Sequence, residues 1–150
     1  MTVDFAFGKA PAYRVATLPQ KGGWSENVCR PEFARLMAWA KKNHVRTGKW
    51  IFCSTANDGF RACLEIRGSA KSEGSIRIRT LPATAVARVR FDPNIVSPRV
   101  VYHGLNDWLR WRKKDKEVRV VRSSRELYDG DPWADKKAWR NTTVEYLVSR

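Results

Sequence analysis

The segment Ile76-Arg77-Ile78-Arg79-Thr80-Leu81-Pro82-Ala83 repeats a pattern from the start of the chain. It alternates apolar and polar residues and ends in a proline turn, as Val3-Asp4-Phe5-Ala6-Phe7 does with the following Ala10-Pro11-Ala12. Further along, Trp111-Arg112-Lys113-Lys114 matches Trp39-Ala40-Lys41-Lys42. Matched positions lie 71 to 72 residues apart, so the sequence predicts two copies of one structural unit.

The first unit is predicted to contain two strands, a helix and a hairpin. Val3–Phe7 and Tyr13–Leu18 alternate as strands do, and the helix is predicted to begin at Pro31. One apolar stripe of this helix is formed by residues at helical spacing: Phe33, Leu36, Met37 and Ala40. Lys49–Thr55 and Phe60–Ile66 are predicted to pair across an Asn-Asp-Gly turn.

The second unit is predicted to follow the same order after a polar linker. Its helix carries apolar residues at helical spacing: Val101, Leu105, Trp108 and Leu109. The strand after this helix is predicted at Val118–Val121 or at Glu126–Tyr128, and the last strand at Thr142–Val148. The pattern is thus a tandem strand-helix-strand-strand arrangement of the α+β class.

The two units are predicted to form a single domain. Repeat one spans about residues 1–67, the linker 68–75, and repeat two about 76–150. Neither unit alone can bury both its helix stripe and its sheet face, so the two must share a core. Clefts between packed halves are preferred ligand sites, so a central cleft is expected at the seam.

Composition fits a packed globular protein. Apolar residues make up 43% of the chain, which has seven tryptophans. No apolar run is long enough to cross a bilayer, and the start of the chain lacks the features of a secretory signal, so we expect a cytoplasmic protein without a membrane partner.

Cys29, Cys53 and Cys63 have no paired spacing, and only His44 and His103 could add ligands. We therefore expect no disulfide, no metal site and no cofactor.

The chain is strongly basic, with a net charge of +14 and a pI near 10.3. Such a charge attracts polyanions at low salt. Basic residues gather on the second predicted helix, interleaved with Trp108 and Trp111: Arg110, Arg112, Lys113 and Lys114. This pattern is typical of nucleic-acid binding. The alternative is a solvated helix face whose lysine stems cover Trp111.

Several motifs, in this order, resemble those of one family. They are the Gly22-Gly23-Trp24 turn, the helix Phe33–Trp39, the stretch Arg125–Pro132 and the terminal Trp139–Val148. Together they resemble the GyrI-like domain, which is the effector-binding domain of AraC- and MerR-type regulators. A stand-alone relative in that family is a bacterial DNA gyrase inhibitory protein.

The resemblance implies a concave antiparallel sheet with two helices around a cleft. That cleft would bind apolar, often cationic, small molecules through a buried carboxylate and aromatic side chains. The positions that match are Glu145 as the carboxylate, with Tyr128 and Trp24 as aromatics. Each has an alternative: Glu145 could pair with an arginine, while Tyr128 and Trp24 could be packing residues. Phe52 and Cys53 stand where the family usually has a tyrosine.

The predicted function is therefore a stand-alone small-molecule-binding domain that acts in sensing, sequestering or transcription regulation. The first alternative is a protein that interacts with gyrase or nucleic acid through its basic surface. The second is a GyrI-like hydrolase using Glu145 and Tyr128. Cys53 and Cys63 lack an identifiable base, and no phosphate-binding loop is present, so binding is favoured over catalysis.

Overall fold

A computed structural model describes residues 3–19, 26–55 and 59–150. Within these residues the chain forms eight strands and three helices. In chain order they are β1 Ala6–Ala10, β2 Tyr13–Thr17, α1 Glu26–Lys42, β3 Thr47–Thr55, β4 Gly59–Ile66, β5 Arg77–Leu81, β6 Thr84–Phe91, α2 Pro98–Lys114, β7 Val120–Tyr128, α3 Lys136–Arg140 and β8 Thr142–Ser149.

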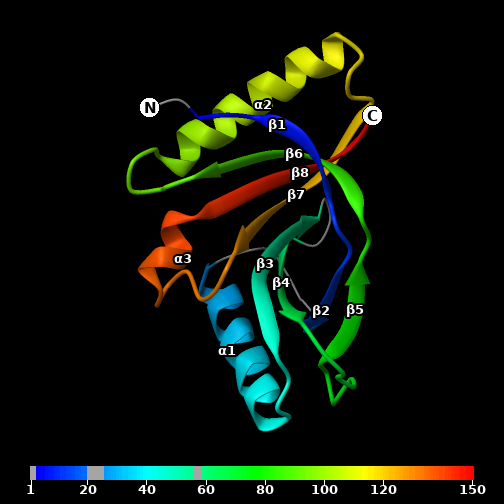
Figure 1. Cartoon of the computed structure of the whole chain (residues 1–150), viewed down its shortest axis with the longest axis vertical. Coiled ribbons are helices and arrows are strands. Elements are labelled where there is room, and N and C mark those ends of the chain that lie inside the picture. Colours follow the sequence, from blue (N-terminus) through cyan, green and yellow to red (C-terminus); the bar gives the residue numbers. More distant parts are fainter. Residues whose placement is uncertain (1–2, 20–25, 56–58) are drawn as a thin grey trace.

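All eight strands belong to one antiparallel sheet in the order β1-β6-β8-β7-β3-β4-β2-β5. The order is symmetric about the central β7–β3 pair: β8 and β4, β6 and β2, and β1 and β5 occupy matching places on its two sides. The sheet is curled into a half-barrel (Figure 1). The predicted α+β class with a concave antiparallel sheet is therefore confirmed.

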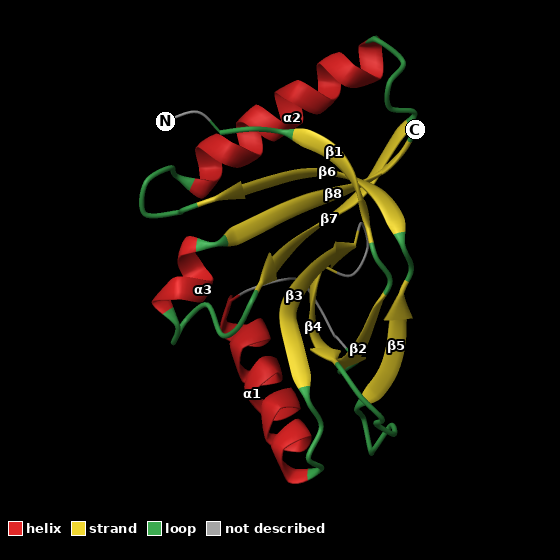
Figure 2. Ribbon diagram, viewed as in Figure 1, coloured by secondary structure: helices red, strands yellow, loops and turns green. Residues whose placement is uncertain are grey.

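The two halves exchange their first strands. β1 pairs with β6, while β5 pairs with β2. Ala10 lies opposite Thr84 at the end of the β1–β6 ladder, and Tyr13 lies opposite Leu81 at the end of the β2–β5 ladder. Both chain segments therefore cross from one ladder to the other in three residues. The paired strands run as one bent ribbon (Figure 2), with Pro11 and Pro82 in the bend. Proline is suited to this place because it cannot donate a ladder hydrogen bond.

Both long helices cover the same face of the sheet. Phe33, Leu36 and Ala40 of α1 are buried in one cluster with Phe52 and Tyr128, as the predicted stripe requires. Three buried residues of α2 form a second cluster with β6 and β8: Val101, Leu105 and Leu109. The opposite, concave face holds a third, smaller cluster around Val15, Ile51 and Leu127.

Four local features differ from the predictions. The first strand, predicted at Val3–Phe7, runs instead as β1 over Ala6–Ala10. Helix α1 begins at Glu26, so Pro31 lies inside it rather than at its start. The second alternative segment, Glu126–Tyr128, lies in β7, and the first, Val118–Val121, overlaps β7 only from Val120; β7 is a single strand with an irregularity between Val121 and Ser123. The short helix α3 was not predicted. Its first turn is capped by Asp135, whose carboxylate accepts a hydrogen bond from the Lys137 amide at 2.9 Å.

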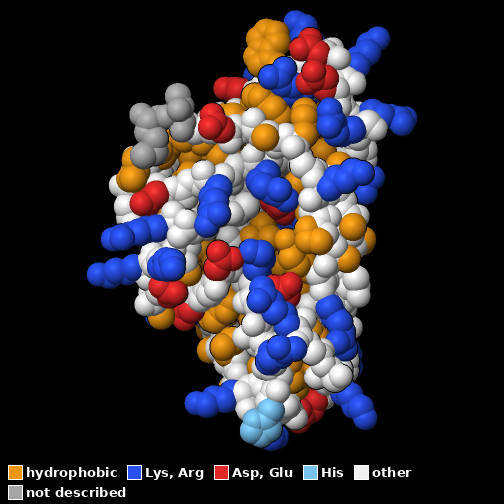
Figure 3. All heavy atoms as spheres, viewed as in Figure 1, with side chains coloured by type: hydrophobic (Ala, Val, Ile, Leu, Met, Phe, Trp, Pro, Cys, Tyr) orange, Lys and Arg blue, Asp and Glu red, His pale blue; other side chains and the backbone are white. Residues whose placement is uncertain are grey.

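Positive charge is dispersed over the face of the molecule seen in Figure 3. Figure 3 shows Lys and Arg side chains from one end of the visible face to the other, interspersed with Asp and Glu. Within the described parts of the chain, no helix has the length and hydropathy needed to cross a bilayer.

Candidate ligand pocket

A pocket of about 480 Å³ lies on the helix-covered face at the seam between the two halves. It is bounded by the sheet strands β3 and β7, the start of α2, and α3. Most of its wall is aromatic or proline: Phe52, Phe91, Tyr128, Trp133, Trp139, Pro93, Pro98 and Pro132. This volume falls in the range that holds drug-sized ligands.

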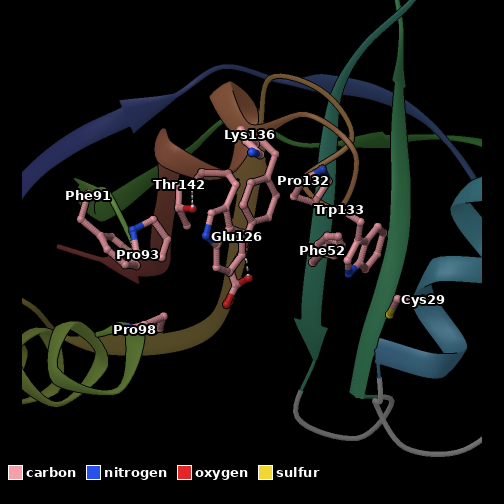
Figure 4. Close-up of a pocket in the computed structure, with 12 residues that line it drawn as sticks. Cys29, Phe52, Phe91, Pro93, Pro98, Glu126, Pro132, Trp133, Lys136 and Thr142 are labelled. Carbon is pink, nitrogen blue, oxygen red and sulfur yellow. Dashed lines mark hydrogen bonds between the residues drawn. The ribbon is translucent and has the colours of Figure 1, made fainter. Parts of the chain in front are cut away.

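Glu126 of β7 supplies the carboxylate of this pocket. Figure 4 shows it between Phe91 and Pro93 on one side and Phe52 and Trp133 on the other. Glu126 is half-buried. No Lys or Arg of the described ranges lies within 4.0 Å of its oxygens, so the negative charge has no ion-pair partner among those residues.

Two tyrosine hydroxyls donate hydrogen bonds to this carboxylate. Tyr128 donates to Oε2 at 2.9 Å, and Tyr102 of α2 donates to Oε1. Burial is the main cause that raises the pKa of both tyrosines well above the ordinary value of 10.0, and the negative charge of Glu126 raises it further. Both hydroxyls therefore remain protonated donors and fix the position of the carboxylate.

The aromatic wall is held by ring-to-ring packing. The Phe52 ring meets Tyr128 edge-on at 5.4 Å and Trp133 edge-on at 5.5 Å, both measured between ring centroids. Tyr128 also stacks on Trp139 at 6.3 Å. Such contacts restrict the rings, so the wall is preformed for a ligand.

The rim of the pocket carries positive charge. Lys136 of α3 is exposed and lines the pocket, and the guanidinium of Arg30 lies 5.6 Å from the centre of the Trp133 ring. The lining therefore has one carboxylate on its inner wall and one ammonium group at its rim.

The three predicted ligand residues have different locations. Tyr128 lines the pocket, as expected of a cleft aromatic. Trp24 lies outside the described residues. Glu145 of β8 lies opposite Arg125 of β7, so it occupies the concave face, while Glu126 and Tyr128 occupy the helix-covered face. Glu145 and Tyr128 therefore lie on opposite faces of the sheet.

Glu145 is instead the centre of a buried ion-pair network. It is 1% exposed. Its Oε2 accepts from Arg88 at 2.6 and 2.7 Å, and its Oε1 accepts from Arg125 at 2.8 Å. The Arg125 guanidinium also lies 5.4 Å from the centre of the Tyr13 ring. Both carboxylate oxygens are thus engaged by arginines, which is the alternative expected for Glu145.

The predicted nucleic-acid residues lie at the far end of α2. The pocket reaches this helix only at Pro98. Residues Arg110, Lys113 and Lys114 are exposed. Arg112 is half-buried, with its guanidinium 5.0 Å from the Trp108 ring centre and 3.5 Å from the Glu117 carboxylate.

Glu126, Tyr102 and Trp133 were not among the predicted site residues. A usable signal for Glu126 was its spacing of two residues from Tyr128, which places both on one face of a strand. Tyr102 comes from a different element, 24 residues away, so only the folded chain brings it to Glu126.

Comparisons with known proteins show the fold. No family model matches the sequence, and no curated protein matches it. Among solved structures, the C-terminal domain of EcmrR aligns with a TM-score of 0.66 and 16% identity over 100% of this chain and 99% of that one. SAV2435 bound to tetraphenylphosphonium aligns with a TM-score of 0.52 and 9% identity over 98% and 94%.

EcmrR also appears in a complex with DNA, EcmrR-RPo. There the TM-score is 0.66 and the identity 16%, covering 99% of this chain and 58% of that one. The chain thus spans little more than half of EcmrR and has the fold of its C-terminal domain. None of these three structures is described as binding gyrase, so the gyrase alternative gains no support.

The pKa values of the pocket tyrosines lead to a pH prediction. Because the folded pKa of Tyr102 and Tyr128 lies above the unfolded value of 10.0, only the unfolded state loses these protons as the pH rises past that value. Folding stability should therefore fall above about pH 10. The Tyr102→Phe/Tyr128→Phe variant should show a flatter decline, measured by urea unfolding. Native phenolate absorbance from both tyrosines near pH 10 would contradict this.

The network on the concave face leads to a stability prediction. Glu145→Gln leaves Arg125 buried without a counter-charge and should lower the free energy of unfolding by about 3–5 kcal/mol. The control is Arg67→Gln, which removes an exposed partner of Glu65 and should cost less than about 1 kcal/mol. Urea denaturation at neutral pH measures the stability of both variants. Equal losses would show that the buried Glu145 network stabilises the fold no more than an exposed ion pair does.

Proposed function

We propose that this chain is a small-molecule-binding domain of the GyrI-like kind, and that its pocket takes an apolar organic cation. The observation that carries the proposal is Glu126: a carboxylate in an aromatic pocket, held by two tyrosine hydroxyls, with no Lys or Arg partner within the described residues.

Charge and aromatic packing both favour this ligand class. A cation about 4 Å from Glu126 would gain roughly 4 kcal/mol of Coulomb energy at an effective dielectric constant near 20. Aromatic faces in the wall add about 0.5–2 kcal/mol for each well-placed ring. A hydrated inorganic ion would gain the Coulomb energy alone. An apolar cation gains the Coulomb energy and the attraction of the aromatic faces, and it also buries hydrophobic surface.

A structural neighbour supports the same class. SAV2435 was solved with tetraphenylphosphonium, a monovalent cation enclosed by phenyl groups. Binding such a ligand suits a sensor, a sequestering protein or a transcription regulator. The neighbour EcmrR, seen on DNA, supports the regulatory form of the proposal.

Tetraphenylphosphonium is therefore the test ligand. Isothermal titration calorimetry should detect its binding to the unmodified protein, and Glu126→Gln should weaken the affinity by at least about tenfold, since roughly 1.4 kcal/mol corresponds to that factor. The matched control is Glu73→Gln, which removes the same charge from an exposed carboxylate outside the pocket and should leave the affinity within about twofold.

A neutral ligand of similar shape tests whether the positive charge of the ligand contributes to binding. Triphenylphosphine oxide has comparable aromatic surface without a formal charge, so it should bind the unmodified protein more weakly. If it bound as tightly as the cation, or if Glu126→Gln retained full affinity, Glu126 would not act as the counter-charge.

A further inference from the structure

A second candidate site lies at the C-terminal end of α2, away from the pocket. Here Trp111 is 61% exposed and is surrounded in sequence by basic side chains. We propose that this end of α2 binds single-stranded nucleic acid, with a base stacked on Trp111 and phosphates held by the neighbouring cations. We call this surface the α2-end patch; it consists of Arg110, Trp111, Lys113, Lys114, Lys116 and Arg119.

The internal duplication provides a comparison for Trp111. Its counterpart, 72 residues earlier, is Trp39 of α1, which is 7% exposed and packed in the core cluster of the first half. Both helices end in a pair of lysines, Lys41-Lys42 and Lys113-Lys114. Cations at a helix C-terminus interact favourably with the helix dipole, so the lysines alone indicate no ligand. The difference between the two helix ends is that the tryptophan ring is exposed on α2 and buried on α1.

An exposed indole among cations has the chemistry of a base-stacking platform. Each nucleobase has an aromatic face, and stacking on an aromatic side chain requires no particular sequence. The Lys114 ammonium lies over one face of the Trp111 ring, 5.1 Å from its centre, so a base would stack on the other face with this positive charge close by. A backbone phosphate next to that base would meet this charge.

Local charge supports the same occupant. From Arg110 to Arg119 there are six basic and two acidic residues, a net charge of +4. Arg112 is excluded from the patch because it already contacts Glu117 and Trp108. Arg110 contacts Asp107 at 3.6 Å, but both side chains are mostly exposed, and such a pair is easily replaced by a phosphate.

Oligothymidylate of about 16 nucleotides, labelled with fluorescein, is the probe for this surface. Fluorescence polarisation should show binding at low salt. With about four phosphate contacts, the affinity should fall roughly fiftyfold between about 50 and 200 mM salt. Trp111→Ala should weaken binding at least about fivefold, and Trp111→Phe should restore part of it, because phenylalanine keeps a stacking face.

The chain offers a matched control for charge. Lys113→Glu/Lys114→Glu and Lys41→Glu/Lys42→Glu change the net charge equally at corresponding ends of α2 and α1. We expect the first pair to abolish binding and the second to weaken it by less than about threefold. Glu126→Gln, in the ligand pocket, should not affect it. Circular dichroism would confirm that each variant is folded.

Three results would overturn the proposal. Equal loss from the two lysine pairs would mean that only the overall charge attracts the oligonucleotide. Unchanged binding by Trp111→Ala would exclude stacking. Val120 and Val121 are also exposed beyond Arg119, so vesicles containing phosphatidylserine form a further arm. If the Trp111→Ala variant lost vesicle binding but kept oligonucleotide binding, the patch would be a membrane contact instead.

Discussion

The antiparallel pairing of β3 with β7 is the contact on which the site depends. It joins the two halves at the centre of the strand order, and it places Phe52 opposite Glu126 and Trp50 opposite Tyr128. Paired residues of an antiparallel ladder lie on one face, so the first half contributes Phe52 beside the carboxylate, and the second half contributes Glu126 and the other aromatic residues of the wall. The pocket belongs to neither unit alone.

Two strand carboxylates of this protein have opposite environments. Glu145 is buried between arginines, where its charge is neutralised and its hydrogen-bonding capacity is used. Glu126, one strand away, accepts hydrogen bonds from two neutral tyrosine hydroxyls. Strand alternation separates them, because Arg125 and Glu126 are adjacent in sequence and point to opposite faces. The face of the sheet to which each glutamate points therefore decides whether it meets arginines or lines the pocket.

The repeat made the architecture predictable, while the site was only partly predictable. Helix stripes and alternating strands have periods that a sequence displays, and both long helices and the sheet were anticipated. β8 is different: Val144 and Glu145 are both buried, so alternation gives no indication of which face is apolar. One of the two arginines that neutralise Glu145 is Arg88, 57 residues away, and no local pattern reveals that contact. Helix α3 has five residues, too few to show a helical period.

The bent ribbon of β1–β2 with β5–β6 makes the molecule equivalent to a strand-swapped dimer within one chain. Each unit lends its first strand to the other, as two separate copies of an ancestral unit could have done across a two-fold axis. The linker between the units converts that association into an intramolecular one, with a high effective concentration. The cost is kinetic: β1 must wait for β6, more than seventy residues later in synthesis, before it has a pairing partner, and such distant contacts slow folding.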